Sequence, residues 1–109
     1  MAYDEGLAHR VGEVLAARAD IIEKKMFGGV GYLLDGNMAC GVHGDRLIVR
    51  VGPERYAHAQ AQPHTREFDL TGRPMKGWIT VGPEGYESAE ELAAWVEQGL
   101  DFAGSLPPK

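Results

Sequence analysis

The 109-residue sequence has few of the features that mark secreted or membrane proteins. The single cysteine, Cys40, excludes an internal disulfide and agrees with a reducing compartment. No apolar run approaches the ~20 residues that cross a membrane, because Gly28, Asp35 and Arg46 interrupt the most apolar region. Residues 1–5 lack the basic flank and apolar run of a signal peptide. We therefore expect a cytoplasmic protein that does not enter a membrane.

Basic residues are also in the minority, with 11 Lys plus Arg against 16 Asp plus Glu and a net charge of -5. This balance is the opposite of the basic footprint of a free-standing nucleic-acid binder, so direct DNA binding is not expected. The acidic excess lies in residues 84–109, whereas residues 46–76 carry more cations than acids. An anion would be attracted to this middle segment, unless its charges are solvated on separate faces.

Serine, cysteine and histidine occur in no arrangement typical of catalysis or metal binding. Ser88 and Ser105 are the only serines, and Cys40 and His43 would point to opposite faces of one strand. The histidines, which show no zinc-ligand spacing, are His9, His43, His58 and His64. We predict no catalytic residue, no metal site and no cofactor, and therefore not an enzyme.

Two short segments invite a functional reading. The glycines of residues 28–31 are similar to a phosphate loop, but they lead into a strand and no Lys-Ser or Lys-Thr follows, which favours a bulged or twisted strand. Residues 73–78 bring two cations and an aromatic side chain into one loop, which could recognise a phosphate or an acidic peptide. The alternative is a plain turn whose Trp78 anchors the core.

Apolar periodicity and turn residues predict one α+β domain over residues 1–109. The order is α-β-β-β-α-β-β-α, an antiparallel five-stranded sheet with helices packed on it, and residues 20–25 form a connector or a short extended lead-in. Helices are expected over residues 4–18, residues 54–60 and from the Ser88 capping box through Ala103. Strands are expected over residues 30–34, 38–42, 47–51, 66–70 and 78–81. Gly99, on the apolar face of the last helix, would permit close approach to the sheet.

A family resemblance follows from several motifs that occur in order. These are Lys-Met-Phe-Gly-Gly-Val-Gly-Tyr at 25–32, Asp-Gly-Asn-Met at 35–38, Cys-Gly-Val at 40–42, Pro-His at 63–64, Thr-Gly-Arg-Pro-Met-Lys-Gly at 71–77, and Leu92 with Trp95. Together they resemble the N-terminal domain of the TfoX/Sxy family. The resemblance implies a fold similar to that of type III secretion chaperones. It also implies kinship with competence regulators, which help a cyclic-AMP receptor protein to activate genes and carry a C-terminal domain without counterpart here. It supplies no catalytic residues.

Two functional hypotheses remain open. The first is a non-enzymatic regulatory or adaptor domain that binds a protein partner, such as a transcription regulator, through the sheet edge or the acidic helix. A homodimer is also open, and the candidate interaction surface comprises Arg50, His64, Arg73 and Lys76. The alternative is a small anionic-ligand-binding domain, or an enzyme that uses Cys40 or His64. Convergence of Arg73, Lys76 and His64 on one concavity would favour this alternative.

Overall fold

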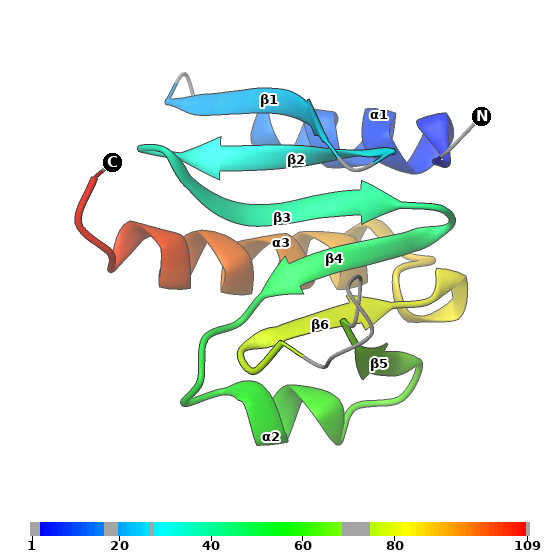
Figure 1. Cartoon of the computed structure of the whole chain (residues 1–109). Helices are drawn as coiled ribbons and strands as arrows, with labels where there is room; N and C mark the ends of the chain where they lie inside the picture. The colour runs from blue at the N-terminus through cyan, green and yellow to red at the C-terminus, as the bar shows by residue number, and fades with distance from the viewer. Residues whose placement is uncertain (1–2, 17–19, 27, 69–74, 109) are drawn as a thin grey trace.

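The computed structural model describes residues 3–16, 20–26, 28–68 and 75–108, which form an antiparallel six-stranded sheet with α-helices on one side (Figure 1). The elements are α1 (Glu5–Leu15), β1 (Ile21–Met26), β2 (Gly29–Leu34), β3 (Asn37–His43), β4 (Arg46–Arg50), α2 (Tyr56–Gln60), β5 (Thr65–Glu67), β6 (Trp78–Val81), the 3-10 turn η1 (Pro83–Gly85) and α3 (Ala89–Gly104). The predicted α+β class is therefore confirmed. No helix in these ranges is long and apolar enough to cross a membrane.

The predicted number of strands and the predicted order are wrong, because the segment taken for a connector or an extended lead-in is the edge strand β1. β1 pairs with β2 over its whole length, from Ile21 opposite Leu34 to Met26 opposite Gly29. Its run of Glu23, Lys24 and Lys25 hides the alternation that identifies a strand in sequence. Charged side chains are typical of an edge strand, since they discourage pairing with a further chain.

The remaining elements differ from the predictions mainly at their ends. β6 has the predicted bounds, and α3 follows the predicted Ser88 cap. α2 begins two residues late, at Tyr56, and β5 is the short strand Thr65–Glu67. α1 ends at Leu15, and the parts of its predicted range at 17–18, like residues 69–70 of the predicted fourth strand, lie outside the described residues.

Local capping and turn chemistry fixes where the helices and the β2–β3 hairpin begin. The Asp4 side chain accepts a hydrogen bond from the Leu7 amide at 3.1 Å, at the start of α1. At α3 the Ser88 hydroxyl accepts from the Glu91 amide at 3.0 Å, and the Glu91 carboxylate accepts from the Ser88 amide at 3.2 Å, which completes the predicted capping box. Asp35 and Gly36 have φ of 52° and 83°, as the tight turn between β2 and β3 requires.

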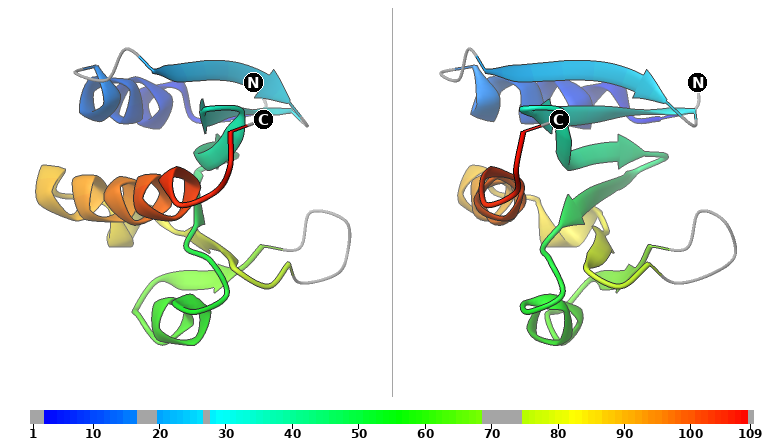
Figure 2. Two further views of the ribbon diagram at one scale, coloured as in Figure 1. Left: turned by 90° about the vertical axis from the view of Figure 1, so that its left-hand side faces the viewer. Right: turned by 60° about the vertical axis from the view of Figure 1, so that its left-hand side comes forward.

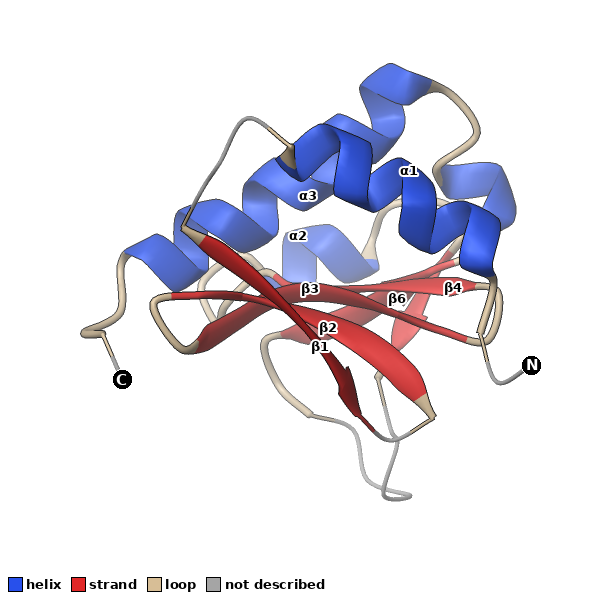
Figure 3. Cartoon of the chain, turned by 90° about the horizontal axis from the view of Figure 1, so that it is seen from above, coloured by secondary structure: helices blue, strands red, loops and turns tan. Residues whose placement is uncertain are grey.

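The core lies between the helices and one face of the sheet (Figure 3). The largest fully buried side chains on the strands include Tyr32 of β2, Leu47 of β4 and Ile79 of β6. α3 lies so close to β3 that a Cβ built on Gly99 would be 2.2 Å from the Ala39 carbonyl oxygen. The predicted close approach at Gly99 is thus confirmed, and it seats α3 on the middle of the sheet.

The sheet order is β1-β2-β3-β4-β6-β5, so β6 and not β5 lies next to β4. The intervening residues lead through α2, which contacts β5 and β6, before the chain returns to the sheet (Figure 1). All strand pairs are antiparallel. This order brings residues 46–50 and residues 78–81 side by side.

Candidate binding surface on the open face of the sheet

One face of the sheet carries no helix among the residues that the structure describes (Figures 2 and 3). Successive residues of a strand point to opposite faces, and Leu47 and Val49 of β4 belong to the core beneath the helices. Arg46, Ile48 and Arg50 therefore point to the other side. The register extends this assignment to the other strands, and we call the surface the open face: Ile22, Lys24, Leu33, Met38, His43, Arg46, Ile48, Arg50, Arg66, Trp78 and Thr80.

The open face is cationic, although the whole chain has a net charge of -5. Its charged members are Lys24, Arg46, Arg50 and Arg66, and none of its residues is an Asp or a Glu. Six carboxylates lie on two of the helices, Glu5 and Glu13 of α1 and Glu90, Glu91, Glu97 and Asp101 of α3, and most of the other described acidic residues lie in turns and loops. The sheet thus separates an acidic helical layer from a basic face, and a basic face attracts anionic partners.

At one end of the open face, two arginines lie side by side without a described carboxylate between them. The Arg46 Nε donates to the Thr80 hydroxyl at 2.8 Å, and its Nη2 donates to the carbonyls of Thr80 and His64 at 3.3 and 3.4 Å. Arg66 of β5 lies opposite Thr80 in the register. Burial lowers the pKa of Arg46, and the nearby charge of Arg66 lowers this pKa further, whereas Asp45 opposes the shift. Arg46 is therefore held in place by neutral acceptors and faces a second positive charge.

At the other end, Arg50 is held between two aromatic rings. Its guanidinium carbon lies 5.0 Å from the centroid of the Trp78 ring and 5.2 Å from that of Phe102. The Trp78 ring in turn packs against Phe68, with centroids 5.9 Å apart. Cation–π contact favours this placement, and burial lowers the pKa of Arg50. The side chain is thus ordered by rings and not by a carboxylate.

An apolar strip occupies the middle of the open face. Ile48 is 5% exposed and lies outside the core beneath the helices, while Ile22 at the edge is 64% exposed. Leu33 and Met38, which are paired in the register, lie between them. The Met38 methyl carbon would be 2.7 Å from a Cβ built on Gly41, so it lies over that glycine next to Ile48. Ile48 is therefore covered, and the apolar surface that the open face exposes comes from Ile22 and, in part, from Leu33 and Met38.

The four residues of the predicted interaction surface do not form one site. Arg50 belongs to the open face, whereas the His64 side chain lines a hollow on the helical side, next to Trp95. Lys76 is exposed just before β6, and His64 precedes β5, whose Thr65 pairs with Val81 at the far end of β6. Arg73 lies outside the described residues. His64 and Lys76 thus sit at opposite ends of β6 and do not converge on a concavity.

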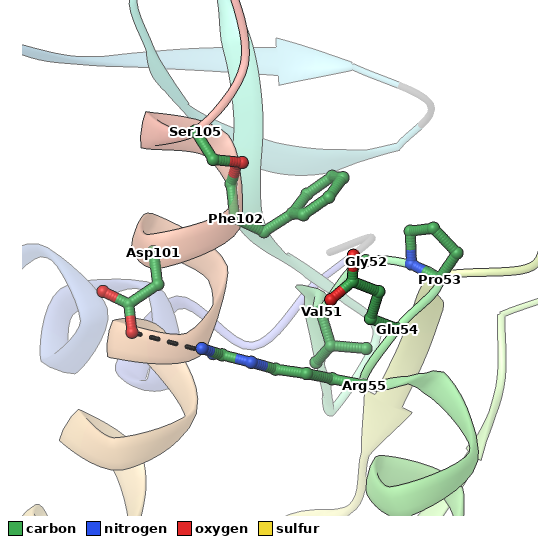
Figure 4. Close-up of a pocket in the computed structure, with 8 residues that line it drawn as sticks. All are labelled: Val51, Gly52, Pro53, Glu54, Arg55, Asp101, Phe102 and Ser105. Atoms are coloured by element: carbon green, nitrogen blue, oxygen red, sulfur yellow. Dashed lines mark hydrogen bonds and ion pairs between the residues drawn. The ribbon is translucent and has the colours of Figure 1, made fainter.

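Among the hollows on the helical side, two lie beside α3 and hold polar side chains. One, of about 290 Å³, lies between the end of β4 and α3 (Figure 4). Arg55 and Asp101 approach to 3.6 Å there, with half or more of each side chain exposed, so the pair contributes little to stability. The other, of about 360 Å³, brings the imidazoles of His58 and His64 near Trp95. No group of three potential metal ligands occurs in the described ranges.

Cys40 is buried in β3 at 0% exposure. Burial raises the pKa of its thiol to about 12. A thiol must lose its proton to become a nucleophile, so this environment opposes the role that the enzyme alternative gave to Cys40. Arg46, Arg66 and Lys24 were not singled out from sequence. The alternation of Arg-Leu-Ile-Val-Arg in β4 does indicate that Arg46 and Arg50 share a face, but Arg66 joins them only through the order of the strands.

The comparison with known protein families agrees with the family resemblance that the sequence motifs indicated. The model of the TfoX N-terminal domain family matches residues 13–103, which span all six strands, α2 and nearly all of α3. No curated protein matches the chain. Because the match covers most of the sequence, the chain belongs to the TfoX N-terminal domain family.

Proposed function

We propose that this chain is a non-enzymatic adaptor in the regulation of transcription, and that it binds an acidic surface of a protein partner with its open face. The observation that carries the proposal is the separation of charge across the sheet. Four cations and an apolar strip share the face without helices, which carries no described carboxylate, whereas α1 and α3 carry six carboxylates. Family membership supports the regulatory part of the proposal.

A protein partner suits this surface better than a small anion does. The cations are spread over β1, β4 and β5 and not gathered around one hollow, and the strip between them is apolar. A protein surface can offer separated carboxylates with apolar side chains between them, and complementary charge then sets orientation and speeds association. The acidic helical layer would repel the same partner, so binding is restricted to one face.

The test is capture of partners by charge-reversed variants of the tagged protein. Arg66→Glu places a carboxylate on the open face, and Arg55→Glu makes the same change in charge on the helical side, where Arg55 is exposed. Proteins from nuclease-treated lysate of the source cells are quantified by mass spectrometry at 50 and 300 mM salt, between which the Debye length falls about 2.4-fold. We expect a partner retained by the unaltered protein and by Arg55→Glu, and lost with Arg66→Glu and with salt.

Two results would contradict the proposal. Equal retention of partners by Arg66→Glu would remove the open face from binding. Recovery of a single partner outside gene expression, with the expected dependence on Arg66, would support the binding face but remove the regulatory role. Circular dichroism of both variants checks that the fold is intact.

A further inference from the structure

The hollow between the end of β4 and α3 lies on the helical side of the sheet, apart from the open face. Residues 51–55 line it from one side, and residues 101, 102 and 105 of α3 and its cap line it from the other (Figure 4). Its volume of about 290 Å³ is at the lower limit of small-molecule sites, which range from about 300 to 1,000 Å³. The hollow therefore suits a small ligand and not a folded partner.

One wall of the hollow is apolar and is held in place. The Phe102 ring extends from α3 over Gly52, where an added Cβ would collide with the ring (Figure 4). The amides of Val51 and Gly52 both donate to the Gly77 carbonyl, at 2.8 and 3.0 Å, which fixes the backbone that the ring contacts. Pro53 is exposed and Phe102 is partly exposed, so this wall offers accessible apolar surface. Because the wall is already formed, little conformational entropy is lost there when a ligand binds.

The rim of the hollow carries both signs of charge. Arg55 reaches across the hollow to Asp101, with 3.6 Å between the Arg55 Nη1 and the Asp101 Oδ2 (Figure 4). The two side chains are 51% and 61% exposed, and an ion pair with such exposure contributes little to stability. The pair can therefore separate when a ligand offers each of its members a new partner.

The end of α3 favours a positively charged ligand group beside Asp101. The last turn of α3, residues 101–104, has no basic residue, and the C-terminal end of a helix carries a partial negative charge. Glu54 also lines the hollow, so two carboxylates accompany the single guanidinium among the residues described there. A ligand that brings only an anionic group would meet this acidic excess, whereas a ligand that also brings a cation would neutralise part of it.

We propose that the hollow binds a free amino acid with an apolar side chain. The ligand's carboxylate lies at Arg55, its ammonium group lies at Asp101, and its side chain lies against Phe102 and Pro53. Both ends make charge-assisted hydrogen bonds, and a guanidinium can hold a carboxylate with two of them. A ligand with one charge would leave either Arg55 or Asp101 without a partner, whereas a zwitterion satisfies both. This binding site lies outside the open face, so the inference goes beyond the proposed adaptor function and does not depend on it.

Leucine and three analogues test each part of the site on the full chain. Isocaproate lacks the ammonium group of leucine, isoamylamine lacks its carboxylate, and glycine lacks its side chain. Amide NMR titrations at low salt measure each dissociation constant and show which residues respond. We expect leucine to bind with a dissociation constant of about 1 mM or below and to shift the amides of residues 51–55 and 101–105. Loss of one exposed charge pair should weaken binding about twofold to fivefold for isocaproate and for isoamylamine.

Variants assign each charge to its residue. Asp101→Asn should weaken leucine about twofold to fivefold without weakening isocaproate, and Arg55→Gln should weaken leucine equally without weakening isoamylamine. Glu97→Gln, an exposed change on α3 outside the hollow, is the matched control and should leave all four probes unchanged. This crossed pattern would not arise from a general loss of structure, which would weaken every probe.

Three results would overturn the inference. These are no leucine binding at about 10 mM, amide shifts away from the hollow, and binding of isocaproate or isoamylamine as tight as that of leucine. The adaptor proposal fails separately, because its capture experiment depends on Arg66 of the open face and not on leucine.

Discussion

Substitution of Gly99 by alanine should destabilise the protein, although alanine favours a helix. Gly99 lies inside α3, and the Cβ that alanine adds would meet the Ala39 carbonyl oxygen at 2.2 Å and the carbonyl carbon at 3.0 Å. Both atoms belong to the backbone of the central strand β3, so no side-chain rotation can relieve the contact. α3 must shift away from the sheet, and its buried residues Trp95, Val96 and Ala103 must shift with it.

The expected change in the free energy of unfolding is the difference between two terms. Alanine in place of glycine stabilises a helix interior by about 1 kcal/mol. Overpacking of a filled core costs about 1–3 kcal/mol, and a contact with rigid backbone places this site at the upper end. The net expectation is a loss of about 2 kcal/mol. At Gly12 of α1 nothing lies within 4 Å of the added Cβ, so Gly12→Ala should raise stability by about 0.5–1 kcal/mol.

Urea unfolding followed by circular dichroism at 222 nm compares the two variants with the unaltered protein. For a domain of this size the expected loss at Gly99 lowers the melting temperature by about 8–16 °C. A neutral or stabilising Gly99→Ala, with Gly12→Ala behaving as expected, would show that α3 does not lie as close to β3 as described. Loss of stability in both variants would refute the reasoning from helix propensity.

Two further predictions concern the α3 cap and the buried thiol. Ser88→Ala removes the hydroxyl that accepts a hydrogen bond from the Glu91 amide. In urea titrations this should lower the free energy of unfolding by about 1 kcal/mol. The control is Ser105→Ala at the exposed other end of α3, which should change the free energy of unfolding less. The pKa of Cys40 is raised from 9.0 when it is unfolded to about 12 in the fold, so the stability that it contributes is complete below pH 9 and is lost as the pH rises toward 12. Urea midpoints between pH 7 and 10.5 should therefore fall above pH 9, and less steeply in Cys40→Ala; an unchanged slope in that variant would contradict the assignment.

The sequence was sufficient where local chemistry determines structure. The Ser88 capping box and the strand at residues 78–81 depend on a few neighbouring residues, and both were predicted correctly. β1 was missed because an edge strand buries little of either face, so its residues Glu23, Lys24 and Lys25 carry no period of two. Only the pairing with β2 defines it as a strand.

The candidate site was harder to predict than the fold, because it depends on which strands become neighbours. Arg50 was singled out, but Arg46 and Arg66 meet only because β6, with Thr80 between them, separates β4 from β5. Proximity in the sequence did not predict proximity in the fold. His64 and Lys76 belong to one cationic segment, yet they lie at opposite ends of β6. Net charge was also a poor guide, since it averages an acidic layer with a basic face.

The position of β6 in the sheet also bears on the order in which the chain folds. β1 to β4 follow one another as adjacent strands with short turns, and such hairpins form in about 1–10 μs. β6 reaches β4 only after the segment 51–77 has been closed into a loop, and the entropy lost in closing a loop grows with its length. We therefore expect the β1–β4 meander to form first and to serve as the template on which β6, β5 and α3 assemble.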